Sequence, residues 1–308
     1  MTVAELRRDF RPLLPTDLRL TLGPIWRGGR DPTMLVRGRG ATIEIWRATR
    51  TPEGPATQRL TGRGAEITVS AWGVGAEWLL QHAPALVGGL DHEDGFVSHH
   101  PVVEGLRRRL PGLRLPRTQA VFEALLPTVL EQKVTGREAR ISYGALTRHW
   151  GDPAPGPTPP GARALVLPPD PKVVADTPSH IFHGANVERK RSDAIRRAAG
   201  YAHRLEEATV DPSELHRRIQ AIPGLGPWTA AEVAFAAVGD ADAVSVGDYH
   251  LKNWVSWNLV GEPRGSDERM LELLEPYRPH RGRVARLITS GGMAAPAYGP
   301  RLTIQTRW

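Results

Sequence analysis

Short runs of alternating or β-branched residues dominate the first hundred positions. Residues 18–22 alternate between apolar and polar, and residues 42–46 (TIEIW) and 66–72 (EITVSAW) combine β-branched with aromatic side chains. Runs of this kind, separated by glycine- and proline-rich turns, are typical of β-strands. A helix is predicted over residues 77–81. The pattern therefore predicts a β-rich α/β domain over residues 1–100.

From about residue 101 the spacing of apolar residues becomes helical. Apolar side chains at 121, 122, 125, 126, 129 and 130 fall on one face of a helix that contains Pro127. Helices are also predicted over residues 190–204 and 213–221. The proline-rich segment 151–161 is predicted to be a surface connection. We expect an α+β N-terminal domain followed by an all-α domain over residues 101–308.

The segment IPGLGPWTAA at residues 222–231 lies between two predicted helices. Gly224 and Gly226 permit a tight turn, and Pro227 suits the first position of a new helix. The segment therefore reads as helix, glycine hairpin (222–227) and helix. Free N–H groups at the start of the second helix can bind a phosphate without reading DNA sequence. The alternative is an ordinary turn between two helices.

Asp248 lies twenty residues after Trp228 and directly before another apolar helical run. Aspartate is a favoured N-cap, so this residue can simply hold the start of that helix. It can also be a carboxylate at the mouth of a cleft near the hairpin. The two roles are compatible.

Composition restricts the chemistry. The chain has 40 Lys+Arg against 33 Asp+Glu, a net charge of +7, which suits a polyanionic partner. It has no cysteine, which excludes disulfides, thiolate metal sites, cysteine-held iron–sulfur clusters and a cysteine nucleophile. No apolar run is long enough to span a membrane, and the first residues do not resemble a signal peptide. We expect a cytoplasmic protein, nucleoid-associated if bacterial, with no membrane partner.

Several segments together resemble the helix-hairpin-helix (HhH-GPD) DNA glycosylase superfamily, and within it the DNA-3-methyladenine glycosylase II type. They are PGLRLP at 111–116, FEALLPTVLEQK at 122–133, the hairpin, Asp248 with Tyr249, and YRPHR at 277–281. The resemblance covers residues 105–290; the first hundred residues match in character only. It implies a monofunctional DNA glycosylase of base excision repair that flips out alkylated purines, such as 3-methyladenine or 7-methylguanine, and hydrolyses their N-glycosidic bond.

The resemblance also implies roles for single positions. Asp248 falls on the catalytic aspartate, and Trp228 falls where bifunctional relatives carry a Schiff-base lysine. Gln132 and Lys133 fall on the minor-groove wedge. DNA phosphate is expected at Gly224, Leu225, Gly226, Trp228 and Thr229. Main-chain carbonyls of Gln220, Ile222 and Leu225 are expected to face a monovalent cation, Na or K.

The implied partners and cofactors are few. They are double-stranded DNA with a damaged base and a downstream abasic-site endonuclease. No organic cofactor and no catalytic metal are implied, and the protein is expected to be a monomer.

A lone carboxylate suits this chemistry. Cleavage of an N-glycosidic bond builds positive charge on the sugar, which a nearby carboxylate stabilises. Extracting the base costs a few kcal/mol and favours weakly paired, damaged bases. Alkylated purines are already cationic, so the leaving base needs little protonation.

The sequence departs from the family pattern in the base pocket, whose candidate residues are Trp228, Glu232, Gln132 and Thr289. Relatives carry aromatic side chains at the positions of Glu232 and Thr289. Glu232 can contact a cationic base, protonate a neutral one, or be a solvated helix residue. Two alternatives therefore stay open: a glycosylase for a deaminated or bulky purine, and a non-catalytic helix-hairpin-helix protein that binds DNA damage.

Overall fold

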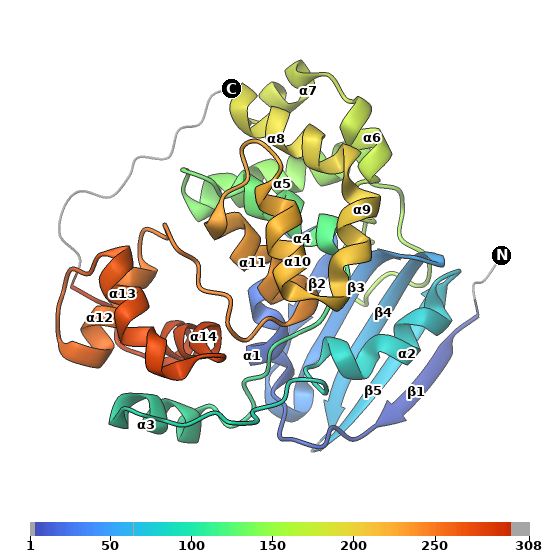
Figure 1. Cartoon of the computed structure of the whole chain (residues 1–308). Helices are drawn as coiled ribbons and strands as arrows, with labels where there is room; N and C mark the ends of the chain where they lie inside the picture. Colours follow the sequence, from blue (N-terminus) through green and yellow to red (C-terminus); the bar gives the residue numbers. More distant parts are fainter. Residues whose placement is uncertain (1–3, 64, 297–308) are drawn as a thin grey trace.

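A computed structural model describes residues 4–63 and 65–296. Its first part is a five-stranded antiparallel sheet with strand order β1-β5-β4-β3-β2. The strands are β1 (Leu6–Phe10), β2 (Met34–Arg37), β3 (Glu44–Thr51), β4 (Gly54–Arg63) and β5 (Glu66–Gly73). The long helix α2 (Ala76–Leu86) follows β5 and lies across the sheet (Figure 1). Strand alternation places Ile45, Leu60 and Val69 in an apolar core on the side of the sheet that α2 covers.

The predictions for this part are confirmed with one exception. Strands β3 and β5 overlap residues 42–46 and 66–72, and α2 contains residues 77–81. The strand predicted at Leu18–Leu22 is wrong, because these residues form helix α1. The side chain of Asp17 accepts hydrogen bonds from the N–H groups of Arg19 (2.8 Å) and Leu20 (3.0 Å), which caps the helix. Apolar residues four apart, Leu18 and Leu22, then share the face toward the core.

Eight helices form a first helical group around one apolar core. They are α4 (Val121–Leu130), α5 (Gly136–Trp150), α6 (Pro171–Asp176), α7 (Ser179–Gly184), α8 (Arg189–Gly200), α9 (Ala202–Glu206), α10 (Pro212–Gln220) and α11 (Pro227–Val238). Helix α4 contains Pro127, as predicted, and all its residues except Glu123 are buried, so the burial extends beyond the one face that the apolar spacing predicts. Residues 151–161 connect α5 to the later helices without forming a helix, also as predicted.

A second helical group combines elements from distant parts of the chain. Helix α3 (Pro101–Arg109) packs with α12 (Leu251–Val260), α13 (Asp267–Leu274) and α14 (Arg281–Gly291) around a separate apolar core (Figure 1). The chain thus enters this group at α3, builds the whole first group, and returns through residues 239–250. Short 3₁₀ turns at Gly23–Ile25, Gly40–Thr42, Glu207–Val210 and Glu275–Tyr277 complete the described elements. None of the described helices is long and apolar enough to cross a membrane.

A buried ion pair joins the segment after α2 to the second helical group. Arg283 on α14 donates to both carboxylate oxygens of Asp91, one of them at 2.9 Å, and to the carbonyl of His92 at 3.2 Å. Asp91 also accepts the N–H of Leu115 at 3.0 Å. Both charged side chains are almost fully buried. Their position ties the end of the sheet unit to the last described helix.

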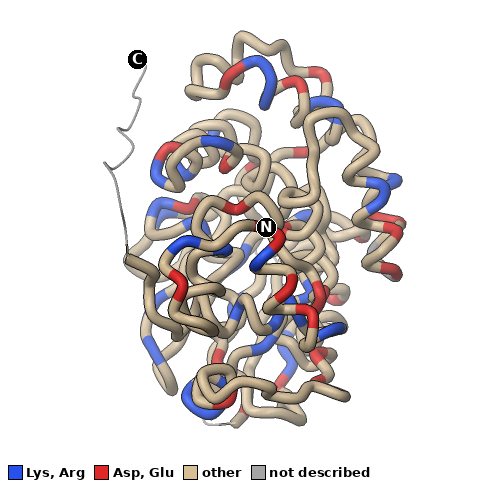
Figure 2. Tube along the Cα trace, turned by 60° about the vertical axis from the view of Figure 1, so that its left-hand side comes forward, with Lys and Arg blue, Asp and Glu red and all other residues tan. Residues whose placement is uncertain are grey.

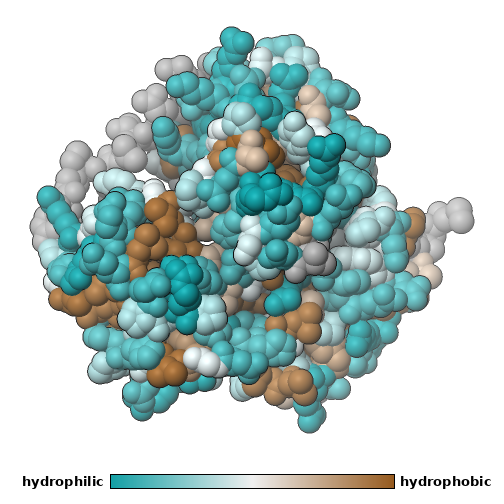
Figure 3. All heavy atoms as spheres, viewed as in Figure 1, coloured by the Kyte–Doolittle hydropathy of each residue, from teal (hydrophilic) through white to brown (hydrophobic). Residues whose placement is uncertain are grey.

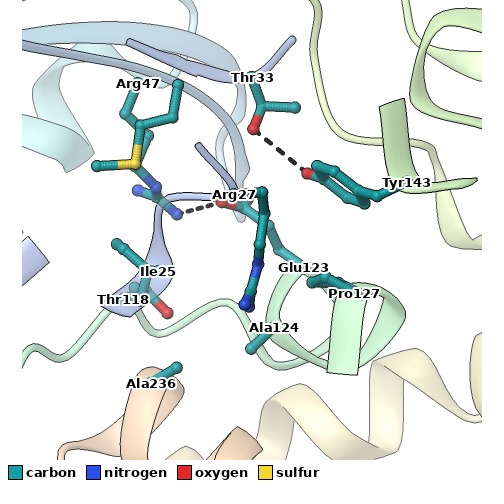
Figure 4. Close-up of a pocket in the computed structure, with 11 residues that line it drawn as sticks. Ile25, Arg27, Thr33, Arg47, Thr118, Glu123, Ala124, Pro127, Tyr143 and Ala236 are labelled. Atoms are coloured by element: carbon teal, nitrogen blue, oxygen red, sulfur yellow. Dashed lines mark hydrogen bonds and ion pairs between the residues drawn. The ribbon is translucent and has the colours of Figure 1, made fainter. Parts of the chain in front are cut away.

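A cavity of about 30 Å³ lies where the sheet meets the first helical group (Figure 4). Arg47 of β3 forms an ion pair of 2.6 Å with Glu123 of α4, and the hydroxyls of Thr33 and Tyr143 are 3.3 Å apart. Burial raises the pKa of the Tyr143 hydroxyl, so it stays neutral. None of the residues of the hairpin or of the segment around Asp248 lines this cavity.

Candidate active site at the hairpin and Asp248

The predicted hairpin is present between α10 and α11. Gly224 has φ +97°, a conformation that glycine adopts without strain. Gly226 is the N-cap of α11, and a Cβ added there meets no atom within 4 Å. Ile222 and Leu225 are buried and anchor the loop. The hairpin therefore leaves the N-terminal end of α11 open to a ligand, and that end favours anions.

Side chains from α8 and from the turn after α4 hold this hairpin. Arg197 of α8 donates from Nε to the carbonyl of Pro223 (3.1 Å). Gln132, just after α4, donates from Nε2 to the carbonyl of Gly224 (3.2 Å) and to the hydroxyl of Thr229 (2.9 Å). The buried Thr229 hydroxyl is thus engaged inside the protein. The hairpin and the segment predicted to be the wedge form one hydrogen-bonded unit.

Lys133 lies at the tip of that segment. It is exposed and has φ +56°, a left-handed conformation that is uncommon for residues other than glycine. Because Gln132 is bonded to the hairpin, Lys133 is the wedge candidate whose side chain lies in solvent. Such strained turns are concentrated at functional sites.

Asp248 is held on both carboxylate oxygens. Oδ1 accepts the N–H groups of His250 (2.7 Å) and Leu251 (2.8 Å), so Asp248 holds the start of α12, although the N-cap residue is His250 and not Asp248 as predicted. Oδ2 accepts a hydrogen bond from the indole Nε1 of Trp228 at 3.3 Å. Asp248 is only partly buried. The carboxylate therefore lies at the start of the second helical group, beside the hairpin helix of the first.

Glu232 lies one turn after Trp228 on α11, so both side chains share a helix face. The hydroxyl of Ser245 donates to Oε1 of Glu232, and the carbonyl of Ser245 accepts the N–H of Asp248 at 3.1 Å. Burial raises the pKa of Glu232, and the negative charges of Glu131 and Asp248 raise it further. The bond from Ser245 and the charge of Arg286 oppose that shift.

Arg286 of α14 is the basic neighbour of Glu232. Its guanidinium carbon lies 5.3 Å from the centre of the Phe235 ring on α11. Its Nε is buried with no hydrogen-bond partner among the described residues.

Thr289 is exposed, and its hydroxyl donates to the carbonyl of Arg286 (3.2 Å). The sequence analysis did not identify Arg286 or Ser245 as site residues. Ser245 could have been found from its position three residues before Asp248, and Arg286 gave no such signal.

The carbonyl groups expected to face a cation lie on the hairpin. That of Ile222 accepts the N–H of Leu225 at 3.0 Å. No backbone N–H of the described residues outside helix interiors pairs with the carbonyls of Gln220 or Leu225. Carbonyl oxygens are ligands that alkali cations accept, so these residues fit the expected group.

Charge is distributed over the whole surface. Figure 2 shows Lys and Arg interleaved with Asp and Glu along most of the visible trace. In Figure 3, hydrophilic residues cover most of the visible face, and small hydrophobic patches lie over the second helical group. Binding of an anion would therefore depend on local groups, such as the hairpin and Arg197, more than on a uniformly basic face.

Comparisons with known proteins agree with this geometry. No family model matches the chain. It is 28% identical over 152 residues to the probable bifunctional transcriptional activator/DNA repair enzyme AlkA of Mycobacterium tuberculosis. The match covers 49% of this chain and 30% of that protein, so the chain spans less than a third of the length of this relative.

Two solved structures share the fold. The 3-methyladenine DNA-glycosylase of Archaeoglobus fulgidus has a TM-score of 0.74 at 16% identity, covering 91% of this chain and 97% of the other. The 8-oxoguanine glycosylase/lyase of Clostridium acetobutylicum, in complex with double-stranded DNA, has a TM-score of 0.70 at 13% identity, covering 94% and 96%. The chain therefore has the fold of these two DNA glycosylases, an antiparallel sheet followed by a largely helical part.

Proposed function

We propose that the protein is a monofunctional DNA glycosylase of base excision repair, which hydrolyses the N-glycosidic bond of alkylated purines. The observation that carries the proposal is the carboxylate of Asp248, held by the start of α12 and by the indole of Trp228. The sequence match to a DNA repair enzyme and the fold shared with a 3-methyladenine glycosylase support the same reaction class.

In this proposal the hairpin binds DNA and Asp248 carries out the chemical step. Free N–H groups at the start of α11 bind a DNA phosphate, and Lys133 enters the gap left by the flipped base. The carboxylate of Asp248 stabilises positive charge at C1′ as the bond to the base breaks, and water completes the hydrolysis. Carbonyls of Gln220, Ile222 and Leu225 would hold a monovalent cation, which would supply positive charge for a backbone phosphate.

Trp228 supports the monofunctional part of the proposal. The resemblance puts this residue where bifunctional relatives carry a lysine nucleophile, and an indole forms no Schiff base. Its Nε1 is instead a donor that orients Asp248. Release of the base should therefore leave the strand unbroken, with an abasic site as the product for an endonuclease.

The first test compares base release from methylated duplex DNA by the wild type and by Asp248→Asn. Asparagine caps helices as well as aspartate does, so the variant keeps the fold and loses the charge. We expect release of methylpurines to fall at least about 100-fold while binding to abasic-site DNA persists. Strand breaks should appear only after alkali treatment.

Asp17→Asn is the matched control, because the carboxylate of Asp17 also accepts two N–H groups at the start of a helix, in the sheet unit. It should release methylpurines at the wild-type rate. Equal release by wild type and Asp248→Asn would contradict the role of Asp248. Abasic-site binding by the wild type with no base release would instead favour a non-catalytic damage-binding protein.

A further inference from the structure

The side of the candidate site where relatives carry an aromatic residue holds an acid in this chain. Glu232 and Trp228 share one face of α11, and that face contacts the turn at residues 245–248. Ser245 links the carboxyl group of Glu232 to the backbone of Asp248, since its hydroxyl donates to Glu232 and its carbonyl accepts the N–H of Asp248. Glu232 is therefore positioned by the same turn that positions Asp248.

The contacts leave one oxygen of Glu232 available. Ser245 donates to Oε1, and no donor of the described residues pairs with Oε2. Arg286 is near enough to influence Glu232 electrostatically, yet no ion pair joins these two residues. Glu131, the other acidic neighbour, is paired with Arg27 at 3.3 Å. Glu232 is thus neither neutralised by a partner nor fully solvated.

We propose that Glu232 is a general acid of this site, which protonates a neutral purine as it leaves. The inference rests on the proposed function and names a further catalytic residue for the same site, needed for neutral bases such as hypoxanthine. Asp248 and Glu232 then divide the roles that a carboxylate pair takes in glycoside hydrolysis: Asp248 stabilises positive charge at C1′, and Glu232 donates a proton to the leaving base.

The chemical step balances. The C1′–N9 bond breaks and its electron pair moves onto the base, while the proton of Glu232 Oε2 passes to a ring nitrogen of the base. Water adds to C1′, and the proton it loses returns to Glu232 through solvent. A base that already carries a positive charge needs no such proton. Glu232 should therefore matter for neutral purines and hardly at all for cationic ones.

The surroundings favour the protonated form of Glu232. Burial raises its pKa, and the charges of Glu131 and Asp248 act in the same direction; Ser245 and Arg286 act against it. These are the charged groups that face it from α4, the 245–248 turn and α14. Excision of a neutral purine should therefore fall as the pH rises through the pKa of Glu232.

The test measures single-turnover release of hypoxanthine and of 7-methylguanine from otherwise identical duplexes. The proteins are the wild type, Glu232→Gln and the control Glu272→Gln, which makes the same change at an exposed residue of α13. We expect Glu232→Gln to slow hypoxanthine release at least 100-fold and 7-methylguanine release less than fivefold. It should also remove the alkaline fall of hypoxanthine release. Glu272→Gln should match the wild type on both bases.

The outcomes separate this inference from the proposed function. Release of 7-methylguanine but not hypoxanthine by the wild type overturns the general acid and leaves the proposed function intact. Equal slowing of both bases by Glu232→Gln also overturns it, since a structural role slows both alike. Release of neither base by the folded wild type contradicts the proposed function and this inference together.

Discussion

The two glycines of the hairpin differ in what a side chain would meet. Gly224 has φ +97°, and a Cβ there would lie 3.0 Å from the side chain of Ala194. Gly226 has φ −103°, and a Cβ there meets no protein atom within 4 Å. The first glycine is needed by the fold. The second is needed only if something approaches the start of α11 closely.

Gly226→Ala should therefore separate binding from stability. We expect its unfolding midpoint to stay near that of the wild type, while its affinity for duplex DNA falls at least tenfold, because the added methyl group faces the bound phosphate. Gly224→Ala is the contrasting variant and should lose about 1–3 kcal/mol of stability through backbone strain. Urea unfolding and fluorescence anisotropy with duplex DNA measure both. Wild-type DNA affinity for Gly226→Ala would place the phosphate elsewhere.

At the scale of elements, local pattern predicts most of what is found. The apolar spacing at 121–130 corresponds to α4, and the glycine-proline segment corresponds to the turn between α10 and α11. It fails at Leu18–Leu22, where alternating residues form a helix because Asp17 caps it and the core lies on one side. Over five residues, alternation and helical spacing predict the same two apolar positions, so tertiary packing decides.

Helix α4 begins without a capping side chain of its own. Ala120 is its N-cap, and the N–H groups of Val121 and Phe122 are bonded, at 2.9 Å each, by the two carboxylate oxygens of Glu206 from α9. Burial raises the pKa of Glu206 to about 7, although these two hydrogen bonds lower it. The helix start is thus linked to a group that titrates near neutral pH.

This link predicts a pH dependence of stability. A carboxyl group whose pKa is raised on folding binds more protons in the folded state, so its contribution falls as pH rises from about 4.5 to about 7. The loss over that window is up to about 3 kcal/mol. Glu206→Gln removes the titration. The wild type should therefore lose stability relative to this variant as the pH rises from 5 to 8. Urea unfolding at both pH values measures this; a constant difference would exclude Glu206 as the titrating group.

At the scale of the molecule, long-range contacts position the site, and local pattern does not predict them. Helix α3 and helices α12–α14 share a core, although the entire first helical group separates them in sequence. Arg286 reaches Glu232 from α14 only because of this arrangement. Periodicity shows which face of a helix is apolar, but not which other element covers it. The hairpin and Asp248 were predictable; the surroundings of Glu232 were not.

The buried pair of Asp91 and Arg283 is the strongest test of this long-range organisation. Arg283→Met leaves the carboxylate of Asp91 buried without its partner and should cost about 3–5 kcal/mol of unfolding free energy. Arg7→Met breaks an exposed pair with Asp9 and should cost less than about 1 kcal/mol. Urea unfolding of both variants and of the wild type measures the difference. Similar losses for the two would show that the buried pair does not join the parts.

The return of the chain to the second helical group also sets an order of events during synthesis. Asp91 and Arg283 are 192 residues apart, so at the usual rate of translation Arg283 is synthesised on the order of 10–40 s after Asp91. The first helical group contains its own core and can condense during that interval, while α3 and Asp91 still lack their partners. Asp248 and Arg286 join Glu232 only when the second group closes. Under the proposed function, a nascent chain would thus display its hairpin before Asp248 is in place beside it.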